Sequence, residues 1–189
     1  MKSLSKLLSQ PVGFPITADD ILEYHATRLL LLIYICGTTD RTRRTTRIDG
    51  LTKFAKLDFF VRYPSFFEKV AESLNITITP ALTTTESKMV RHHYGPWDKR
   101  YYQLLPYLEA RELITVEKNG TQFQFVLTQL GKHIAEQLSM HNEFESLTNH
   151  MRSVKDVLGK MSGNALKTLI YQVFDAEVAQ KPLGEIIQP

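Results

Sequence analysis

The sequence of 189 residues contains a single cysteine, Cys36. One thiol can form neither a disulfide within the chain nor a cysteine metal cluster, so we expect a protein of a reducing compartment, the cytoplasm. The apolar run that includes this cysteine, residues 29–36, is far shorter than the roughly 18 residues that a membrane-spanning helix needs. Residues 1–10 lack the apolar core and cleavage site of a signal peptide. We therefore expect no membrane contact.

A strong charge of either sign is also lacking. The chain has 23 Lys and Arg residues against 20 Asp and Glu residues, a net charge of +3, which is too small for the whole chain to imply nucleic acid as a partner. Any basic site must therefore be local. Apolar residues make up 43% of the chain and charged residues 23%, which is typical of a soluble globular protein with one domain plus an appendage, or with two small domains.

Catalytic motifs are missing as well. The sequence has no phosphate-binding GxxxxGK[ST] or GxGxxG loop, no GxSxG nucleophile elbow and no HExxH zinc motif. His92 and His93 would point to opposite faces of a strand, and the spacing of His133, His141 and His150 does not place them on one helical face. We therefore predict a non-enzymatic protein with no catalytic residues, no metal site and no cofactor.

Helical periodicity is present from the first third of the chain onward. Residues 1–16 have no sustained period and are expected to form an N-terminal arm. Thr17 is expected to cap a helix that extends to Cys36, and the last two turns of this helix are apolar on all sides, as in a central buried helix. Apolar spacing predicts a second helix over residues 51–63 and a third that begins at Pro64.

The clearest pattern lies between residues 94 and 140. A turn and a cap at residues 94–98 are followed by a predicted helix over residues 99–111. Two alternating strands then flank Asn119-Gly120, which predicts a β-hairpin with a type I′ turn, and Thr128 is expected to cap the next helix. A helix, a tight hairpin and a second helix in this order are typical of a winged-helix domain.

These elements give a prediction for the whole chain. We expect a mostly α fold with a small β-hairpin, in which an N-terminal arm (residues 1–16) precedes a winged-helix domain (residues 17–140). A C-terminal helical extension, a pair of helices, then occupies residues 141–189. A short strand is also expected within residues 76–87, which are rich in Thr and β-branched residues.

Two groups of residues are candidates for nucleic-acid contact. Residues 38–49 carry four arginines among threonines and are predicted to form an exposed basic loop, and the helix that precedes the hairpin would present polar side chains to a DNA groove. The candidates are Arg41, Arg43, Arg44 and Arg47 in the loop and Lys99, Arg100 and Gln103 on the helix. The alternative is that the loop arginines are solvated or meet an acidic partner protein.

A heptad-like seam begins after Asn142, which is expected to cap a further helix. Its apolar residues follow the 3, 4, 3, 4 spacing of a short coiled coil: Phe144, Leu147, Met151, Val154 and Leu158. The seam is a candidate partner-binding surface. It would equally suit a helix that packs on its own domain, and only the burial of the seam in the isolated chain distinguishes the two.

Two segments carry a resemblance to a known family. They read DGLTKFAKLDFFVRYP at residues 49–64 and MVRHHYGPWDKRYY at residues 89–102. Within roughly residues 20–140 the chain resembles the small middle component of bacterial ABC three-component defence systems of the Lamassu type. The resemblance implies a non-catalytic adaptor that links an SMC-like ATPase to an effector, commonly a nuclease, in a response to phage or plasmid DNA. The aromatic residues of the motifs are expected to be core packing: Phe59, Phe60, Tyr63, Trp97, Tyr101 and Tyr102.

Two classes of function follow. The first is the adaptor subunit of an SMC-like ATPase defence complex, whose partners are the ATPase and the effector, with DNA contact of low sequence specificity as a further possibility. The second is a free-standing winged-helix transcription regulator that forms a homodimer through the C-terminal seam. A regulator should bind a specific duplex alone as a dimer, whereas an adaptor should bind DNA weakly or not at all without its ATPase.

Overall fold

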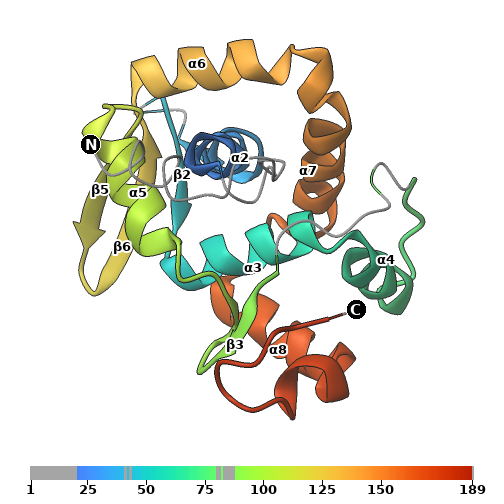
Figure 1. Cartoon of the computed structure of the whole chain (residues 1–189). Helices are drawn as coiled ribbons and strands as arrows, with labels where there is room; N and C mark the ends of the chain where they lie inside the picture. Colours follow the sequence, from blue (N-terminus) through green and yellow to red (C-terminus); the bar gives the residue numbers. More distant parts are fainter. Residues whose placement is uncertain (1–20, 41, 43, 80–81, 83–87, 189) are drawn as a thin grey trace, which may run out of the picture.

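The computed structural model describes residues 21–40, 42, 44–79, 82 and 88–188, and the expected N-terminal arm and Thr17 cap lie outside this part of the chain. The protein is mostly helical and has small antiparallel sheets (Figure 1). This agrees with the predicted mostly α class. One cluster of buried side chains extends from Ala26 to Ile187, so the C-terminal helices share the core of the preceding residues.

Helix α2 (Leu22–Cys36) lies at the centre of the molecule. Figure 1 views it almost along its axis, with α6, α7 and α3 on three sides. Residues 29–33 are almost completely buried, because all faces of these turns are apolar and each face meets another element. The prediction of a central buried helix is therefore confirmed.

The larger sheet contains four strands in the order β1 (Thr38–Asp40), β2 (Thr45–Asp49), β6 (Gln122–Leu127) and β5 (Ile114–Asn119). Every neighbouring pair is antiparallel. The prediction of an exposed basic loop over residues 38–49 is wrong, because Thr38–Asp40 and Thr45–Asp49 are the paired strands β1 and β2. Ile48 is buried and lies opposite Phe125 of β6, so a strand partner far along the sequence and a core contact hold the segment extended.

The predicted β5–β6 hairpin is confirmed, but its turn differs. Asn119 pairs with Gln122, so the two turn residues are Gly120 and Thr121. A type I′ turn needs a positive φ at both, and only Gly120 has one, at 61°. The prediction of a type I′ turn at Asn119-Gly120 is therefore wrong, because the turn lies one residue later and is not of type I′.

Helix α3 (Leu51–Arg62) begins and ends close to the predicted positions, and α4 (Pro64–Ser73) begins at Pro64 as predicted. Their aromatic rings form a cluster that reaches the C-terminal part of the chain, with the ring centroids of Phe66 and Phe174 4.5 Å apart. Five of the six motif aromatics are buried, as expected for core packing. The sixth, Tyr102, is 67% exposed, so the core-packing prediction is wrong for this residue.

A second hairpin, formed by β3 (Val90–His92) and β4 (Gly95–Trp97), precedes helix α5 (Tyr101–Ala110). The sequence predicted only a turn and a cap here. The strand expected within residues 76–87 is absent from the described residues of that range, and the first strand after α4 begins at Val90. A backbone bridge between Val90 and Ile186 ties the C-terminal segment to β3.

The C-terminal helices are α6 (Gln129–Ser139), α7 (Glu145–Leu158) and α8 (Gly163–Val173), and a π-helical turn (Asp175–Ala179) follows. Thr128 caps α6 as predicted, with its hydroxyl oxygen accepting a hydrogen bond from the Gly131 amide at 2.8 Å. Asn142 does not cap α7. It begins a short 3-10 turn (Asn142–Phe144), and Phe144 is the residue before α7.

The seam on α7 packs inside the chain. Leu147, Met151, Val154 and Leu158 are buried, Phe144 is partly buried, and α7 packs against α2 and α3. The prediction that these five residues bind a partner is therefore corrected, since the protein's own helices cover the apolar stripe. The intramolecular alternative is the one that the structure contains.

Candidate binding surface

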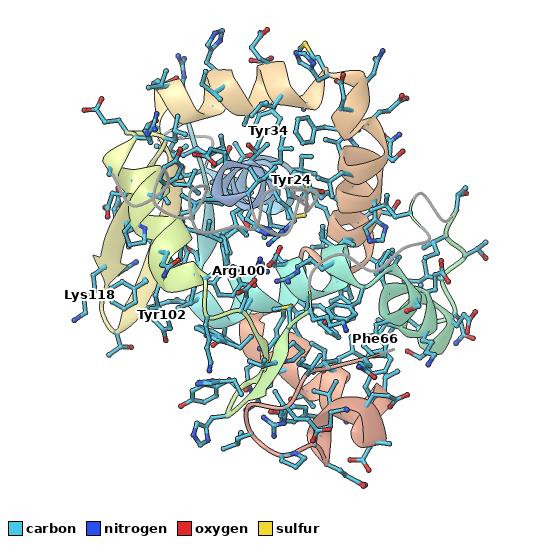
Figure 2. The ribbon with its side chains drawn as sticks, in the orientation of Figure 1. Tyr24, Tyr34, Phe66, Arg100, Tyr102 and Lys118 are labelled. Atoms are coloured by element: carbon cyan, nitrogen blue, oxygen red, sulfur yellow. The ribbon has the colours of Figure 1, made fainter. Side chains whose placement is uncertain are left out.

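Helix α5 and the β5–β6 hairpin present an outward surface on one edge of the molecule. The inward side of α5 carries Tyr101, Leu104, Leu105 and Leu108, all buried, as the helical spacing predicted. The outward side carries Tyr102 and Gln103, both exposed. In Figure 2 Tyr102 and the hairpin residue Lys118 project from this same edge, away from the core. We call α5 and the tip of the hairpin (residues 117–123) the α5–hairpin surface.

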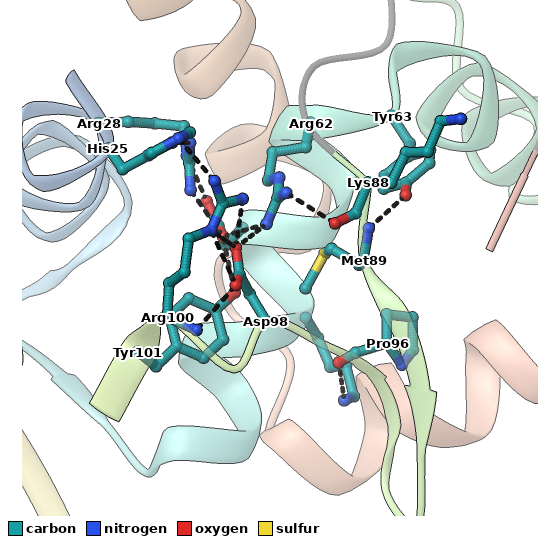
Figure 3. A network of polar contacts seen from close by, with 12 residues as sticks. His25, Arg28, Arg62, Tyr63, Lys88, Met89, Pro96, Asp98, Arg100 and Tyr101 are labelled. Atoms are coloured by element: carbon teal, nitrogen blue, oxygen red, sulfur yellow. Dashed lines mark hydrogen bonds and ion pairs between the residues drawn. The ribbon is translucent and has the colours of Figure 1, made fainter. Parts of the chain in front are cut away.

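A group of buried charges fixes the start of α5. Oδ1 of Asp98 accepts a hydrogen bond from the Arg100 backbone N–H at 2.9 Å, which satisfies a free amide at the helix start. Oδ2 of the same carboxylate lies 2.7 Å from Nη1 of Arg62 and 2.8 Å from Nη2 of Arg100 (Figure 3). Asp98 therefore joins the first residues of α5 to α3.

A second carboxylate lies deeper in the same group. Oδ1 of Asp58 lies 2.9 Å from Nε of Arg28, and Oδ2 accepts a hydrogen bond from the Tyr101 hydroxyl at 2.6 Å. Oδ2 is also 3.6 Å from Nη1 of Arg62, and all of these side chains are fully buried. Because these residues come from α2, α3 and α5, the charges hold three helices in one arrangement.

Both carboxyl groups are held ionised. Burial alone would raise the pKa of Asp98, but the hydrogen bond from Arg100 and the charge of Arg62 outweigh burial and lower the pKa to about 2. Burial likewise acts to raise the pKa of Asp58, but the charges of Arg28 and Arg62 more than offset burial and hold that pKa below its ordinary value. The group is thus a charged structural element that positions α5.

The predicted nucleic-acid residues fall into different settings. Arg100 is held inward by Asp98, with its Nη1 also 2.6 Å from Nε2 of His25, and Arg47 on β2 pairs with Asp40 at 3.3 Å and Asp49 at 3.0 Å. Each guanidinium is therefore held by carboxylates of its own chain, whereas DNA contact by an exposed loop or a groove-reading helix needs a guanidinium that projects into solvent. Arg44, Lys99 and Gln103 are exposed. Arg41 and Arg43 lie outside the described residues.

Sequence reasoning missed a second group of cations, beside the β3–β4 hairpin. We call it the basic cluster; it comprises Lys56, Arg91, His92, Lys99 and Lys167. Lys56 is fully buried on α3, and its Nζ donates a hydrogen bond to the Pro96 carbonyl at 3.0 Å. A lysine within the apolar pattern of residues 54–61 was the available signal, since lysine is rarely buried without a special contact.

Comparison with protein-family models, with curated proteins and with solved structures found no match to this chain. Within the described residues, no helix is both long and apolar enough to cross a bilayer. Those residues also contain no group of three or more His, Cys, Asp or Glu side chains arranged to hold a metal ion.

Proposed function

We propose that residues 21–140 form a winged-helix domain. The order of elements supports this: α2, β2, α3, α5, β5 and β6 follow the winged-helix succession of helix, strand, two helices, strand, wing and strand. The spatial order β2-β6-β5 also fits, because the first strand of such a domain pairs with the last. Relative to this pattern, α4 and the β3–β4 hairpin are an insertion between α3 and α5.

We further propose that the chain is the non-catalytic adaptor subunit of an SMC-like ATPase defence complex, linking the ATPase to its effector. The observation that carries this proposal is the character of the α5–hairpin surface. It exposes two aromatic residues, Tyr102 at 67% and Phe123 at 49%, and its tip carries Glu117 and Lys118, one charge of each sign. Exposed aromatic rings with balanced charges favour a protein partner over the phosphate backbone of DNA.

Two observations weigh against the alternative, a free-standing winged-helix regulator. Its expected dimer interface, the seam on α7, is buried within the chain, and its expected groove-reading residue Arg100 is held by Asp98. The adaptor function does not need either feature. We therefore favour the adaptor, with duplex binding by the isolated chain as the outcome that would support the regulator.

Co-purification tests the proposal. The partners that the proposal requires, an SMC-like ATPase and an effector, are co-expressed with the wild-type protein, with Tyr102→Asp, and with the control Met140→Asp. Met140 is 68% exposed and follows the end of α6, so it matches Tyr102 in exposure but lies elsewhere on the surface. We expect Tyr102→Asp to lose the partner while Met140→Asp retains it, with both variants keeping the wild-type melting temperature.

Two results would overturn the adaptor proposal. One is equal recovery of the partners with all three proteins. The other is tight, sequence-specific duplex binding by the isolated chain as a dimer, measured by fluorescence anisotropy across a salt series.

A further inference from the structure

The basic cluster brings together side chains from four segments of the chain. Lys56 comes from α3, Arg91 and His92 from β3, Lys99 from the turn before α5, and Lys167 from α8. Tyr171 of α8 lies among them. Its ring centroid is 5.1 Å from the Arg91 guanidinium carbon, and its Cε1 would lie 3.5 Å from a Cβ atom at Gly95. The same Cβ position is 3.4 Å from Nζ of Lys56, so the side chains of Lys56 and Tyr171 both approach Gly95.

Several polar atoms of the cluster are buried without a partner. In the described part of the chain, no hydrogen-bond acceptor reaches Nε or Nη1 of Arg91, or Nδ1 of His92. Nζ of Lys56 has three N–H groups, and the contact with the Pro96 carbonyl uses one of them. Buried donors that lack acceptors destabilise a fold. An anion bound at the partly exposed Arg91 would bring to this group of donors the negative charge that the described residues do not supply.

The charged neighbours that shift the pKa of Lys56 and His92 are cations. Burial, and then the charges of Arg91 and Lys167, lower the pKa of Lys56 to about 7. Burial, and then the charges of His93, Lys56, Arg91 and Lys99, lower the pKa of His92. Every charged neighbour named for these two groups is a cation.

Two acidic side chains on the C-terminal segment pair with lysines outside the cluster. Glu185 follows Gly184, whose backbone N–H donates a hydrogen bond to the Arg91 carbonyl. The carboxylate of Glu185 nevertheless pairs with Lys181 at 3.3 Å. Glu177 pairs with Lys69 at 3.7 Å. The basic cluster therefore has no carboxylate counter-charge from these residues.

The cluster is open to an anion from solvent. Arg91 and Lys167 are partly exposed, and His93 and Lys99 are exposed, although Lys56 lies beneath them and is fully buried. Tyr94, 57% exposed at the tip of the β3–β4 hairpin, has Nζ of Lys167 5.9 Å from its ring centroid. An exposed aromatic ring thus stands next to the cations.

We propose that the basic cluster binds the terminal phosphate group of a ligand. A guanidinium fork suits phosphate oxygens, and a terminal phosphate carries up to two negative charges, which would offset several fixed cations at once. Arg91 and Lys167 contact the phosphate at the surface, and Lys56 adds its charge from below. The ring of Tyr94 beside the cations would stack on a nucleobase, which makes a nucleotide one source of the phosphate. This proposal does not depend on the adaptor function.

The test is a titration of the full chain, free of partners, followed by calorimetry and by melting temperature. The probes are inorganic phosphate, adenosine monophosphate, and a short single-stranded oligonucleotide with and without a 5′-phosphate, all at constant ionic strength set with sodium chloride. We expect saturable binding and a raised melting temperature with the phosphate probes. Tighter binding of the monophosphate than of inorganic phosphate identifies a nucleotide, and tightest binding of the 5′-phosphorylated strand identifies a nucleic-acid end.

Variants locate the site. Arg91→Gln and Lys167→Gln should each weaken phosphate binding about tenfold or more. The control Lys132→Gln should bind like the wild type, because Lys132 is exposed on α6, at the opposite end of the molecule in Figure 1. Lys167→Gln keeps the test valid if Arg91→Gln fails to fold. The proposal is overturned by an absence of saturable binding, by equal binding of the oligonucleotide without its phosphate, or by unchanged affinity in both cluster variants.

Discussion

Arg62 and Asp98 form a buried ion pair with 2.7 Å between Nη1 and Oδ2, although 36 residues separate them in the sequence. Between them lie α4 and the β3–β4 hairpin, so the pair closes the segment of the chain that separates α3 from α5. The position of the α5–hairpin surface therefore depends on a contact between α3 and the residue that precedes α5.

Asp98→Asn should destabilise the protein strongly, because it leaves the buried charge of Arg62 without its closest partner. We expect a loss of about 3–5 kcal/mol in the free energy of unfolding, measured by urea denaturation. Glu143→Gln is the control, since Glu143 pairs with His141 on the exposed surface and its loss should be close to neutral. Equal effects of the two substitutions would contradict the structural role of the buried group.

Acid should weaken the fold over a defined range. The pKa of Asp98 is about 2 in the folded protein against an ordinary value of 3.8, so the folded state favours the ionised form. Its contribution of about 2–3 kcal/mol is present above pH ~4 and is lost as the pH falls toward ~2. Urea titrations between these values should show the loss in the wild type and a flatter profile in Asp98→Asn. An identical slope in both proteins would contradict the assignment.

Raising the pH above neutral should stabilise the fold through Lys56. Its folded pKa of about 7 lies below the ordinary 10.5, so the unfolded chain binds the extra proton between these values. Stability should therefore rise as the pH increases from ~7 toward ~10. Lys56→Met should reduce this rise, and bound phosphate should reduce it too by favouring the charged amine. A wild-type slope in Lys56→Met would show that other groups cause the rise.

The buried seam gives a prediction about folding. Leu147→Asp places a charge where α7 packs on the core and should cost about 3–5 kcal/mol, which shows as a lower urea midpoint for the isolated chain. Ser146→Asp is the matched control, because the neighbouring Ser146 is exposed. Loss of a partner without loss of stability in Leu147→Asp would restore the seam as an intermolecular surface.

The elements set by local sequence were predictable and those set by distant contacts were not. Periodicity and capping were sufficient for α3, the β5–β6 hairpin and the Thr128 cap, because their signals lie within a few residues. The local sequence of the β1–β2 hairpin indicates a loop, because its strand character depends on β6, about 75 residues later. Arg47 was for the same reason assigned to DNA, although β1 and β2 pair it with Asp40 and Asp49.

The site residues follow the same rule. Asp58 and Arg28 are 30 residues apart, and no spacing in the sequence indicates that they meet in the core. Lys56 and Arg91 were not linked, since only the packing of α3, β3 and α8 brings them to one place. In contrast, the outward position of Gln103 on α5 followed directly from helical spacing.

Hydrogen exchange of the chain alone and with the proposed partner, an SMC-like ATPase, tests the central claim most directly, because it maps the contact without substitutions. We predict slower exchange in residues 99–111 and 117–123 on complex formation, with little change in the exposed turns of α6. Protection confined to α6 and α7, or no protection in either α5 or the β5–β6 hairpin tip, would contradict the assignment of the α5–hairpin surface as the partner-binding site.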